Sequence, residues 1–115
     1  MAEGIAPRPY GLRDISAQIT VNSDLLTIDA IKCYIVGNIC IVNARLVTKT
    51  SISSNNQVFM SGFPKTVSGI KFQIAKYNGV NVAGIVSSLG DIRNDYSSFN
   101  ENEQFFINIA YPTND

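Results

Sequence analysis

The stretch Tyr34–Thr48, YIVGNICIVNARLVT, decides the fold class. Two strongly apolar runs meet there at the dipeptide Gly37-Asn38. Glycine and asparagine tolerate positive φ, which the two-residue turn of a β-hairpin requires. A turn at these two residues places Val36 opposite Ile39. The stretch therefore predicts two antiparallel strands joined by a tight turn.

These strands are apolar on both faces, which is unusual for a sheet with one face in water. In strand 39–47 one face carries Ile39, Ile41 and Val47, and the other carries Cys40, Val42, Ala44 and Leu46. Strand 104–111 sets Phe105, Ile107 and Ile109 against Phe106 and Ala110. Neighbouring loops could cap the second face of such central strands. Alternatively, copies of the same chain cover it, since large exposed apolar patches mark interfaces. We favour the second reading, which predicts a symmetric homotrimer.

The predicted hairpin also indicates whether the two cysteines form a disulfide. Cys33 and Cys40 share a face but lie diagonally, about 7–8 Å apart between Cβ atoms or somewhat less. A disulfide needs a Cβ separation of about 3.5–4.5 Å. Two thiols in a chain without histidine do not complete a zinc site either. We predict two buried, reduced cysteines and no metal.

The rest of the chain reads as a single all-β domain. Residues 1–14 are rich in proline and glycine and are predicted to be an arm or linker, which leaves 15–115 as the domain. Alternating residues 15–21, ISAQITV, predict a half-buried strand. A change of phase near Asp29-Ala30 predicts a bulge or bend.

Turn signals and residue types complete the fold prediction. Asn78-Gly79 predicts a second tight hairpin. No window of the chain shows helical periodicity, and asparagine, serine, threonine, valine and isoleucine dominate instead. We therefore expect a small antiparallel β-barrel or sandwich of roughly seven or eight strands.

Composition excludes several classes of function. The 115 residues include nine basic and nine acidic side chains, so the net charge offers no electrostatic footprint for nucleic acid or an anionic membrane. The start, MAEGIAPRPY, lacks the pattern of a signal peptide. The chain has no histidine, no nucleophile elbow and no phosphate-binding glycine loop. We expect neither an enzyme nor a cofactor.

The segment GDIRNDYSSFNENE, residues 90–103, has the highest density of carboxylates. Read as a calcium loop from Asp91, it places Arg93 at the third position, Tyr96 where glycine is required, and Asn102 where the bidentate glutamate belongs. An EF-hand is therefore rejected. What remains is a polar segment that combines carboxylates, an arginine and two aromatic rings.

The order of motifs along the chain resembles the C-terminal head, or knob, domains of bacteriophage tail fibres and receptor-binding proteins, and looks closest to those of lactococcal siphophages. The resemblance covers about residues 15–115. It rests on Val36-Gly37-Asn38, Phe63-Pro64, Ser88-Leu89-Gly90-Asp91-Ile92-Arg93 and the aromatic Tyr111 before a short tail. The chain departs from the family at Ser61-Gly62, where a leucine–proline pair is common.

This resemblance implies an all-β, homotrimeric head at the tail tip or baseplate of a virion. Such a head is joined to the rest of the phage tail and recognises a saccharide of the bacterial cell envelope. It implies neither nucleic-acid binding nor membrane insertion. The family's binding residues vary with the host, so no site residue is carried over from it.

Chemistry suggests where a saccharide would bind. Sugar sites combine a flat aromatic ring with planar hydrogen-bonding groups, and an arginine would also hold a phosphate. The candidate residues are Asp91, Arg93, Asp95, Tyr96 and Phe99, together with Tyr77 and Asn78 at a hairpin tip. A purely structural reading of the same residues is that Asp91 caps a turn, Arg93 pairs with it and Phe99 is core. If the site lies elsewhere, the alternative is a cleft between subunits near Ser51–Asn56.

Three classes of function follow from these observations. The first is a viral adhesin head that binds an envelope saccharide. The second is a structural cap or trimerisation domain of a fibre, without a ligand of its own. The third is a cellular β-domain of the cytokine or lectin kind, which the missing signal peptide argues against.

Overall fold

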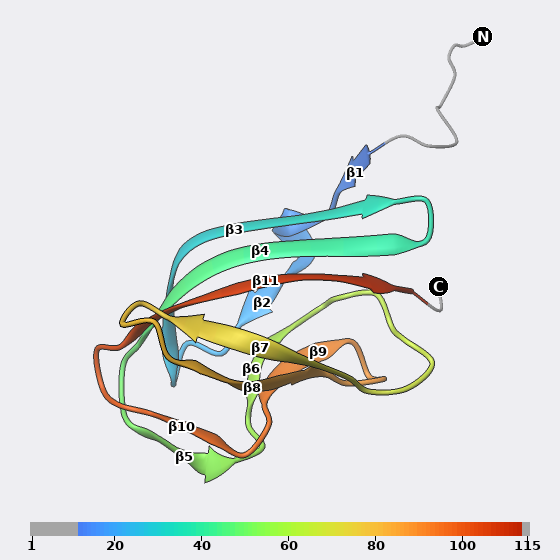
Figure 1. Cartoon of the computed structure of the whole chain (residues 1–115). Coiled ribbons are helices and arrows are strands. Elements are labelled where there is room, and N and C mark those ends of the chain that lie inside the picture. Colours follow the sequence, from blue (N-terminus) through green and yellow to red (C-terminus); the bar gives the residue numbers. More distant parts are fainter. Residues whose placement is uncertain (1–11, 114–115) are drawn as a thin grey trace, which may run out of the picture.

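A computed structural model of the chain describes residues 12–113. These residues form eleven β-strands, one short 3-10 turn at Ser16–Gln18 and no α-helix (Figure 1). The strands are β1 (Leu12–Asp14), β2 (Thr20–Val21), β3 (Leu26–Val36), β4 (Ile39–Thr48), β5 (Ile52–Asn55), β6 (Val58–Ser61), β7 (Ile70–Lys76), β8 (Asn81–Val86), β9 (Asp91–Asn94), β10 (Ser97–Phe99) and β11 (Gln104–Pro112). The all-β prediction is confirmed, but the expected seven or eight strands were too few, because several strands are only two to four residues long.

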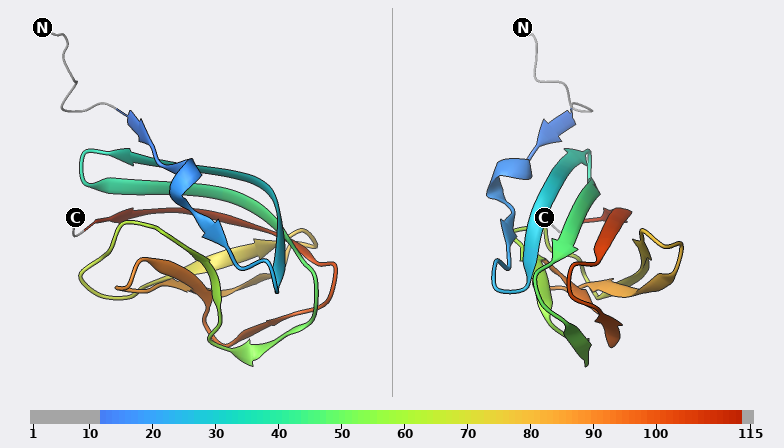
Figure 2. Two further views of the ribbon diagram at one scale, coloured as in Figure 1. Left: turned by 180° about the vertical axis from the view of Figure 1, so that it is seen from behind. Right: turned by 90° about the vertical axis from the view of Figure 1, so that its left-hand side faces the viewer.

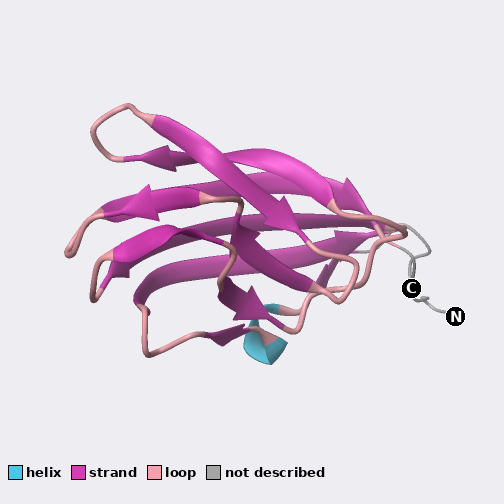
Figure 3. Cartoon of the chain, turned by 90° about the horizontal axis from the view of Figure 1, so that it is seen from below, coloured by secondary structure: helices cyan, strands magenta, loops and turns pink. Residues whose placement is uncertain are grey.

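The strands pair antiparallel in one large sheet and one small one. The nine-stranded sheet has the order β1-β3-β4-β11-β7-β8-β9-β6-β2, and β10 pairs with β5 beside it. Although β2 and β3 lie near opposite ends of this order, only residues 22–25 separate them along the chain. The sheet must therefore curl until its two ends approach each other, as Figures 2 and 3 show.

The curled sheet stops short of a closed barrel. Strand β11 pairs with β4 from Gln104 to Pro112, but with β7 only at Phe105 and Phe106. Beyond those two residues β11 and β7 diverge toward the right of Figure 1. The result is a half-barrel, which agrees with the barrel-like prediction at this coarser level.

The hairpin in the middle of the large sheet has the predicted register. Val36 lies opposite Ile39, and the pairing continues regularly to Ile31, opposite Ala44. The predicted bulge is also present, since the register shifts between Ile28 and Ala30. The turn chemistry of Gly37-Asn38 thus fixes which side chains of β3 and β4 face inward.

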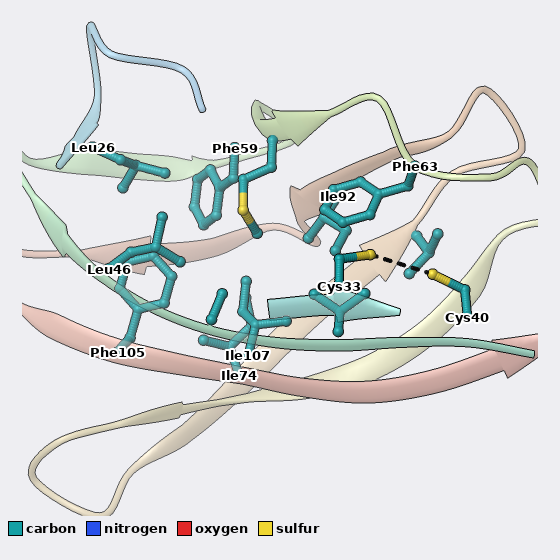
Figure 4. Close-up of a cluster of buried hydrophobic side chains, with 14 of the residues drawn as sticks. Leu26, Cys33, Cys40, Leu46, Phe59, Phe63, Ile74, Ile92, Phe105 and Ile107 are labelled. Atoms are coloured by element: carbon teal, nitrogen blue, oxygen red, sulfur yellow. Dashed lines mark hydrogen bonds between the residues drawn. The ribbon is translucent and has the colours of Figure 1, made fainter. Parts of the chain in front are cut away.

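The inner face of the half-barrel holds the core. Phe59, Phe99 and Phe105 pack around one another with ring centroids 4.9–5.6 Å apart. Figure 4 labels Phe59 and Phe105 among their buried neighbours. Around them lie fully buried aliphatic side chains from strands on both sides of the half-barrel: Leu26, Leu46, Ile52, Met60, Ile74, Ile92 and Ile107. Each such side chain contributes about 1.5–3 kcal/mol on burial, so the core dominates the favourable side of the folding free energy.

Cys33 and Cys40 lie at the edge of this core as free thiols, as predicted. Both side chains are inaccessible to solvent, and their Sγ atoms are 3.6 Å apart within a weak hydrogen bond (Figure 4). The hydrogen bond to Cys40 and the burial together raise the pKa of Cys33. Because neither thiol is accessible to solvent, the pair behaves as part of the apolar core rather than as a reactive site.

One strand prediction was wrong. Residues 15–21 do not form a half-buried strand, because Ser16–Gln18 turns as a 3-10 helix and only Thr20–Val21 is extended. Local side-chain bonds compete with a ladder here: the backbone N–H of Ser16 donates to Asp14 Oδ1, and the N–H of Cys33 donates to Ser16 Oγ. A strand forms just before this segment instead: Leu12–Asp14, which the sequence placed in the linker, pairs with β3.

Two glycines offer a test of the fold. Gly79 and Gly90 have similar positive φ angles, 89° and 84°, but a Cβ atom would meet open space at Gly79 and would overlap the carbonyl oxygen of Phe63 at Gly90. Gly79→Ala should therefore cost only the strain of a left-handed residue, about 1–3 kcal/mol. Gly90→Ala adds a steric clash with backbone, and we expect its loss of unfolding free energy in denaturant to be clearly the larger. Equal losses in the two variants would contradict the close approach of Gly90 to the Phe63 backbone.

Candidate functional site

The candidate site is built on strands β9 and β10 and the two residues that join them, Asp95 and Tyr96. Strand β9 lies between β6 and β8, with Arg93 opposite Val58 on one side and Ile85 on the other. Ile92 faces inward and is fully buried, so Arg93 points to the other face of the strand. Alternation along β9 therefore places the charged side chain at the surface.

Arg93 is held by a carboxylate two residues earlier on the same face. Its Nε donates to Asp91 Oδ1 at 2.7 Å, and its Nη2 donates to Asp91 Oδ2 at 3.1 Å. This is a bidentate pair, the strongest arrangement of a guanidinium and a carboxylate. The hydroxyl of Ser87 also donates to Asp91 Oδ1, at 2.7 Å. Both carboxylate oxygens are thus occupied within the chain.

The electrostatics of the pair follow from these contacts. Burial of Asp91 raises the pKa of its carboxyl, but the hydrogen bonds from Arg93 and Ser87 outweigh this effect and hold the pKa below the ordinary value of 3.8. In turn, the hydrogen bond to Asp91 raises the pKa of Arg93. The two charges stabilise each other in their ionised forms.

Asn94, the last residue of β9, links this strand to the segment 53–57. Its side chain is fully buried. Its Nδ2 donates to the carbonyls of Ser53 and Ser97, at 3.3 and 2.7 Å, and its Oδ1 accepts from the N–H of Gln57 at 2.7 Å. One amide group therefore ties the β9–β10 turn to the segment 53–57, which is distant in the sequence.

Tyr96 is the exposed aromatic ring of the site. It lies in the left-handed region with φ 59°, and 68% of its surface is exposed. Its N–H donates to the carbonyl of Asn55 at 2.9 Å, and its carbonyl accepts from Ser54 Oγ at 2.6 Å. A tyrosine in this conformation is strained and persists only when its surroundings hold it, as Ser54 and Asn55 do here.

Two further side chains complete the surface around this turn. The carboxylate of Asp95 lies 3.3 Å from the ammonium of Lys71 on β7, whose side chain is largely exposed. Asn56 accepts a hydrogen bond from Arg93 Nη1 at 3.0 Å and donates to the carbonyl of Asn94. We call the group the Tyr96 surface, which consists of Ser54, Asn55, Asn56, Arg93, Asp95 and Tyr96.

The structure brings together four of the residues predicted to bind a saccharide and separates the other three from them. Asp91, Arg93, Asp95 and Tyr96 lie in one segment of β9 and its following turn. Tyr77 and Asn78 lie at the tip of the β7–β8 hairpin, away from the β9–β10 turn in Figures 1 and 2. We therefore leave these two residues out of the candidate site.

Phe99 needs a correction, because its ring is core rather than surface. It is only 3% exposed and packs edge-on against Phe59. The ammonium of Lys76 lies 4.7 Å above the ring and 3.2 Å from the carboxylate of Glu103, which closes the remaining side. The ring is therefore not available for stacking on a sugar.

Sequence reasoning treated the segment Ser51–Asn56 as an alternative location for the site. The structure makes it part of the same surface, because Ser54, Asn55 and Asn56 bond to Tyr96 and Arg93. Asn94 was missed altogether. A fully buried polar residue has no signature in a single sequence, since its role depends on the distant backbone groups that it bonds.

Comparisons of the chain with protein-family models, with curated proteins and with solved structures found no match.

Metal binding and membrane insertion by a helix find no support in residues 12–113. No group of three or more histidine, cysteine or acidic side chains in this part of the chain is placed to hold a metal ion. No helix among the same residues is long and apolar enough to cross a membrane.

The lowered pKa of Asp91 predicts a pH dependence of stability. Because the folded-state pKa is below the unfolded value, the stabilising contribution is full above about pH 4 and is lost as the pH falls through the folded pKa. Asp91→Asn should therefore be less stable than the parent at pH 7, and the difference should shrink toward pH 2. Urea unfolding at both values measures it. A difference that stays constant with pH would show that the carboxylate charge is not what stabilises this pair.

Proposed function

We propose that the chain is the head domain of a bacteriophage tail fibre or receptor-binding protein, and that it binds a saccharide of the bacterial cell envelope through the Tyr96 surface. In this proposal the domain acts at the tail tip or baseplate of a virion and carries out no catalysis. The support is of two kinds, the sequence resemblance over about residues 15–115 and the chemistry of the surface itself.

The observation that carries the proposal is the exposed ring of Tyr96, on a backbone that hydrogen bonds hold in place. An aromatic face accepts the apolar C–H side of a sugar, and a ring whose backbone is already held loses little conformational freedom on binding. Near it lie hydrogen-bonding groups of the kind that a sugar hydroxyl needs: the side-chain amide of Asn56 and the guanidinium of Arg93.

The position of the chain ends is compatible with a head on a fibre. Leu12, the first described residue, pairs with Val36, which faces Ile39 and then Pro112 at the end of β11. The described chain therefore starts and finishes in one row across the sheet. The β9–β10 turn lies away from this row, on the part of the half-barrel that contains β6, β8 and β9 (Figure 1). A connection to the tail at that row would leave the Tyr96 surface free for a receptor.

The proposal includes a homotrimer. Tyr34, Ile41 and Ala110 form a cross-strand row on the outer face of β3, β4 and β11. Val36, Ile39 and Pro112 form the next row along the same face. None of these six side chains reaches the core, and a second copy of the chain would cover them. A structural cap without a ligand shares this feature, so the binding experiment has to separate the two functions.

The test is a glycan array probed with the parent and two variants. We expect the parent to bind a defined set of glycans. Tyr96→Ala should bind them at least tenfold more weakly, a loss of about 1.4 kcal/mol or more. Val67→Ala removes an apolar side chain that is also largely exposed, in the loop between β6 and β7, and should bind as the parent does.

Two results would speak against this function. If the folded parent binds no glycan, the domain is a structural cap of a fibre. If Tyr96→Ala binds as tightly as the parent, the saccharide site lies elsewhere on the head. Circular dichroism of each variant keeps loss of binding apart from loss of fold.

A further inference from the structure

The charges around the Tyr96 surface are already matched within the chain. The carboxylate of Asp91 accepts two hydrogen bonds from the guanidinium of Arg93. The carboxylate of Asp95 lies 3.3 Å from the ammonium of Lys71. Two positive charges therefore face two negative charges at short range. No unpaired cation is left among these four residues to attract an anionic ligand.

The geometry of Arg93 shows what it can still offer. A guanidinium has five N–H donors. Three of them are used, by the two oxygens of Asp91 and by Asn56 Oδ1, so one N–H remains on each terminal nitrogen. The side chain is 26% exposed, so Arg93 is partly open to solvent. The two remaining N–H donors suit neutral acceptors such as two neighbouring hydroxyl oxygens of a sugar ring.

An anion placed against the same donors would also approach a carboxylate. Asp91 lies on the other edge of the guanidinium, 2.7 Å from Nε, and it stays ionised because its pKa is lowered. Repulsion from Asp91 therefore offsets much of the attraction that Arg93 exerts on a phosphate or carboxylate. A neutral hydroxyl meets no such repulsion.

We propose that the ligand of the Tyr96 surface is an uncharged saccharide, recognised through hydroxyl groups, and not a phosphorylated or acidic one. This inference rests on the proposed function, because it specifies the class of saccharide that the same surface takes. It narrows the expectation from sequence, in which Arg93 was a candidate to hold a phosphate. In the folded chain that charge already has a partner.

The experiment uses one neutral glycan that binds on the array, together with the same glycan carrying a phosphate monoester. Both are titrated calorimetrically against the parent at about 20 mM and about 500 mM sodium chloride, where screening of exposed charges differs strongly. We expect the neutral glycan to bind at least as tightly as the phosphorylated one. Its dissociation constant should change less than twofold between the two salt concentrations.

Two variants test the cause. Asp91→Asn and Asp95→Asn each remove a compensating carboxylate at almost constant shape, and they release Arg93 and Lys71 respectively. At low salt each variant should bind the phosphorylated glycan at least tenfold more tightly than the parent does. Because the two carboxylates sit in separate ion pairs, a folding defect in one variant leaves the other as a test.

The outcomes separate the two proposals. If the array yields only phosphorylated or acidic glycans, or if the phosphorylated glycan binds the parent tenfold more tightly than the neutral one, the surface binds saccharide but this inference is wrong. If neither variant gains affinity for the phosphorylated glycan, charge pairing is not the cause of selectivity and the inference is likewise overturned. If no glycan binds at all, the proposed function is wrong, and this inference is wrong as well because it rests on that function.

Discussion

The buried amide of Asn94 is the interaction on which the candidate site depends. A polar side chain with no exposure is tolerated only when its donors and acceptors are satisfied, and Asn94 bonds to Ser53, Gln57 and Ser97. An unpaired amide at this depth would cost about 1–3 kcal/mol. This cost favours the one arrangement in which the chain from Ser53 to Gln57 lies against the β9–β10 turn.

The chemistry of the surface follows from that arrangement. With Ser54 and Asn55 in place, Tyr96 is held in a left-handed conformation and its ring faces solvent. With Asn56 in place, Arg93 has a third bond that orients it, after the two to Asp91. The surface is thus rigid, aromatic and balanced in charge. These are properties that fit a hydroxyl-rich ligand better than an ionic one.

The sequence predicted those parts of the structure that depend on local chemistry. Gly37-Asn38 determined the register of β3 and β4, and the change of phase at Asp29-Ala30 located the bulge. The pairing of Arg93 with Asp91, proposed as the structural alternative to a binding role, is present. Prediction from sequence failed where contacts between residues distant in the chain determine the local structure or the burial of a side chain. Ser16 bonds to Cys33 and turns the chain at a place where alternation suggested a strand. Phe99 was a site candidate whose alternative was a core position, and the sequence alone left the choice open because its partner Phe59 lies far from it in sequence.

The central claim is that Asn94 holds the Tyr96 surface in shape while the core holds the rest of the fold. Amide hydrogen exchange of Asn94→Ala, followed residue by residue by NMR, tests it most directly. The account predicts that the amides of Gln57 and Tyr96, which bond to Asn94 Oδ1 and to Asn55 O, lose protection. The amides along the β3–β4 ladder should keep theirs. Unchanged protection at Gln57 and Tyr96, or a uniform loss across the whole domain, would contradict the account.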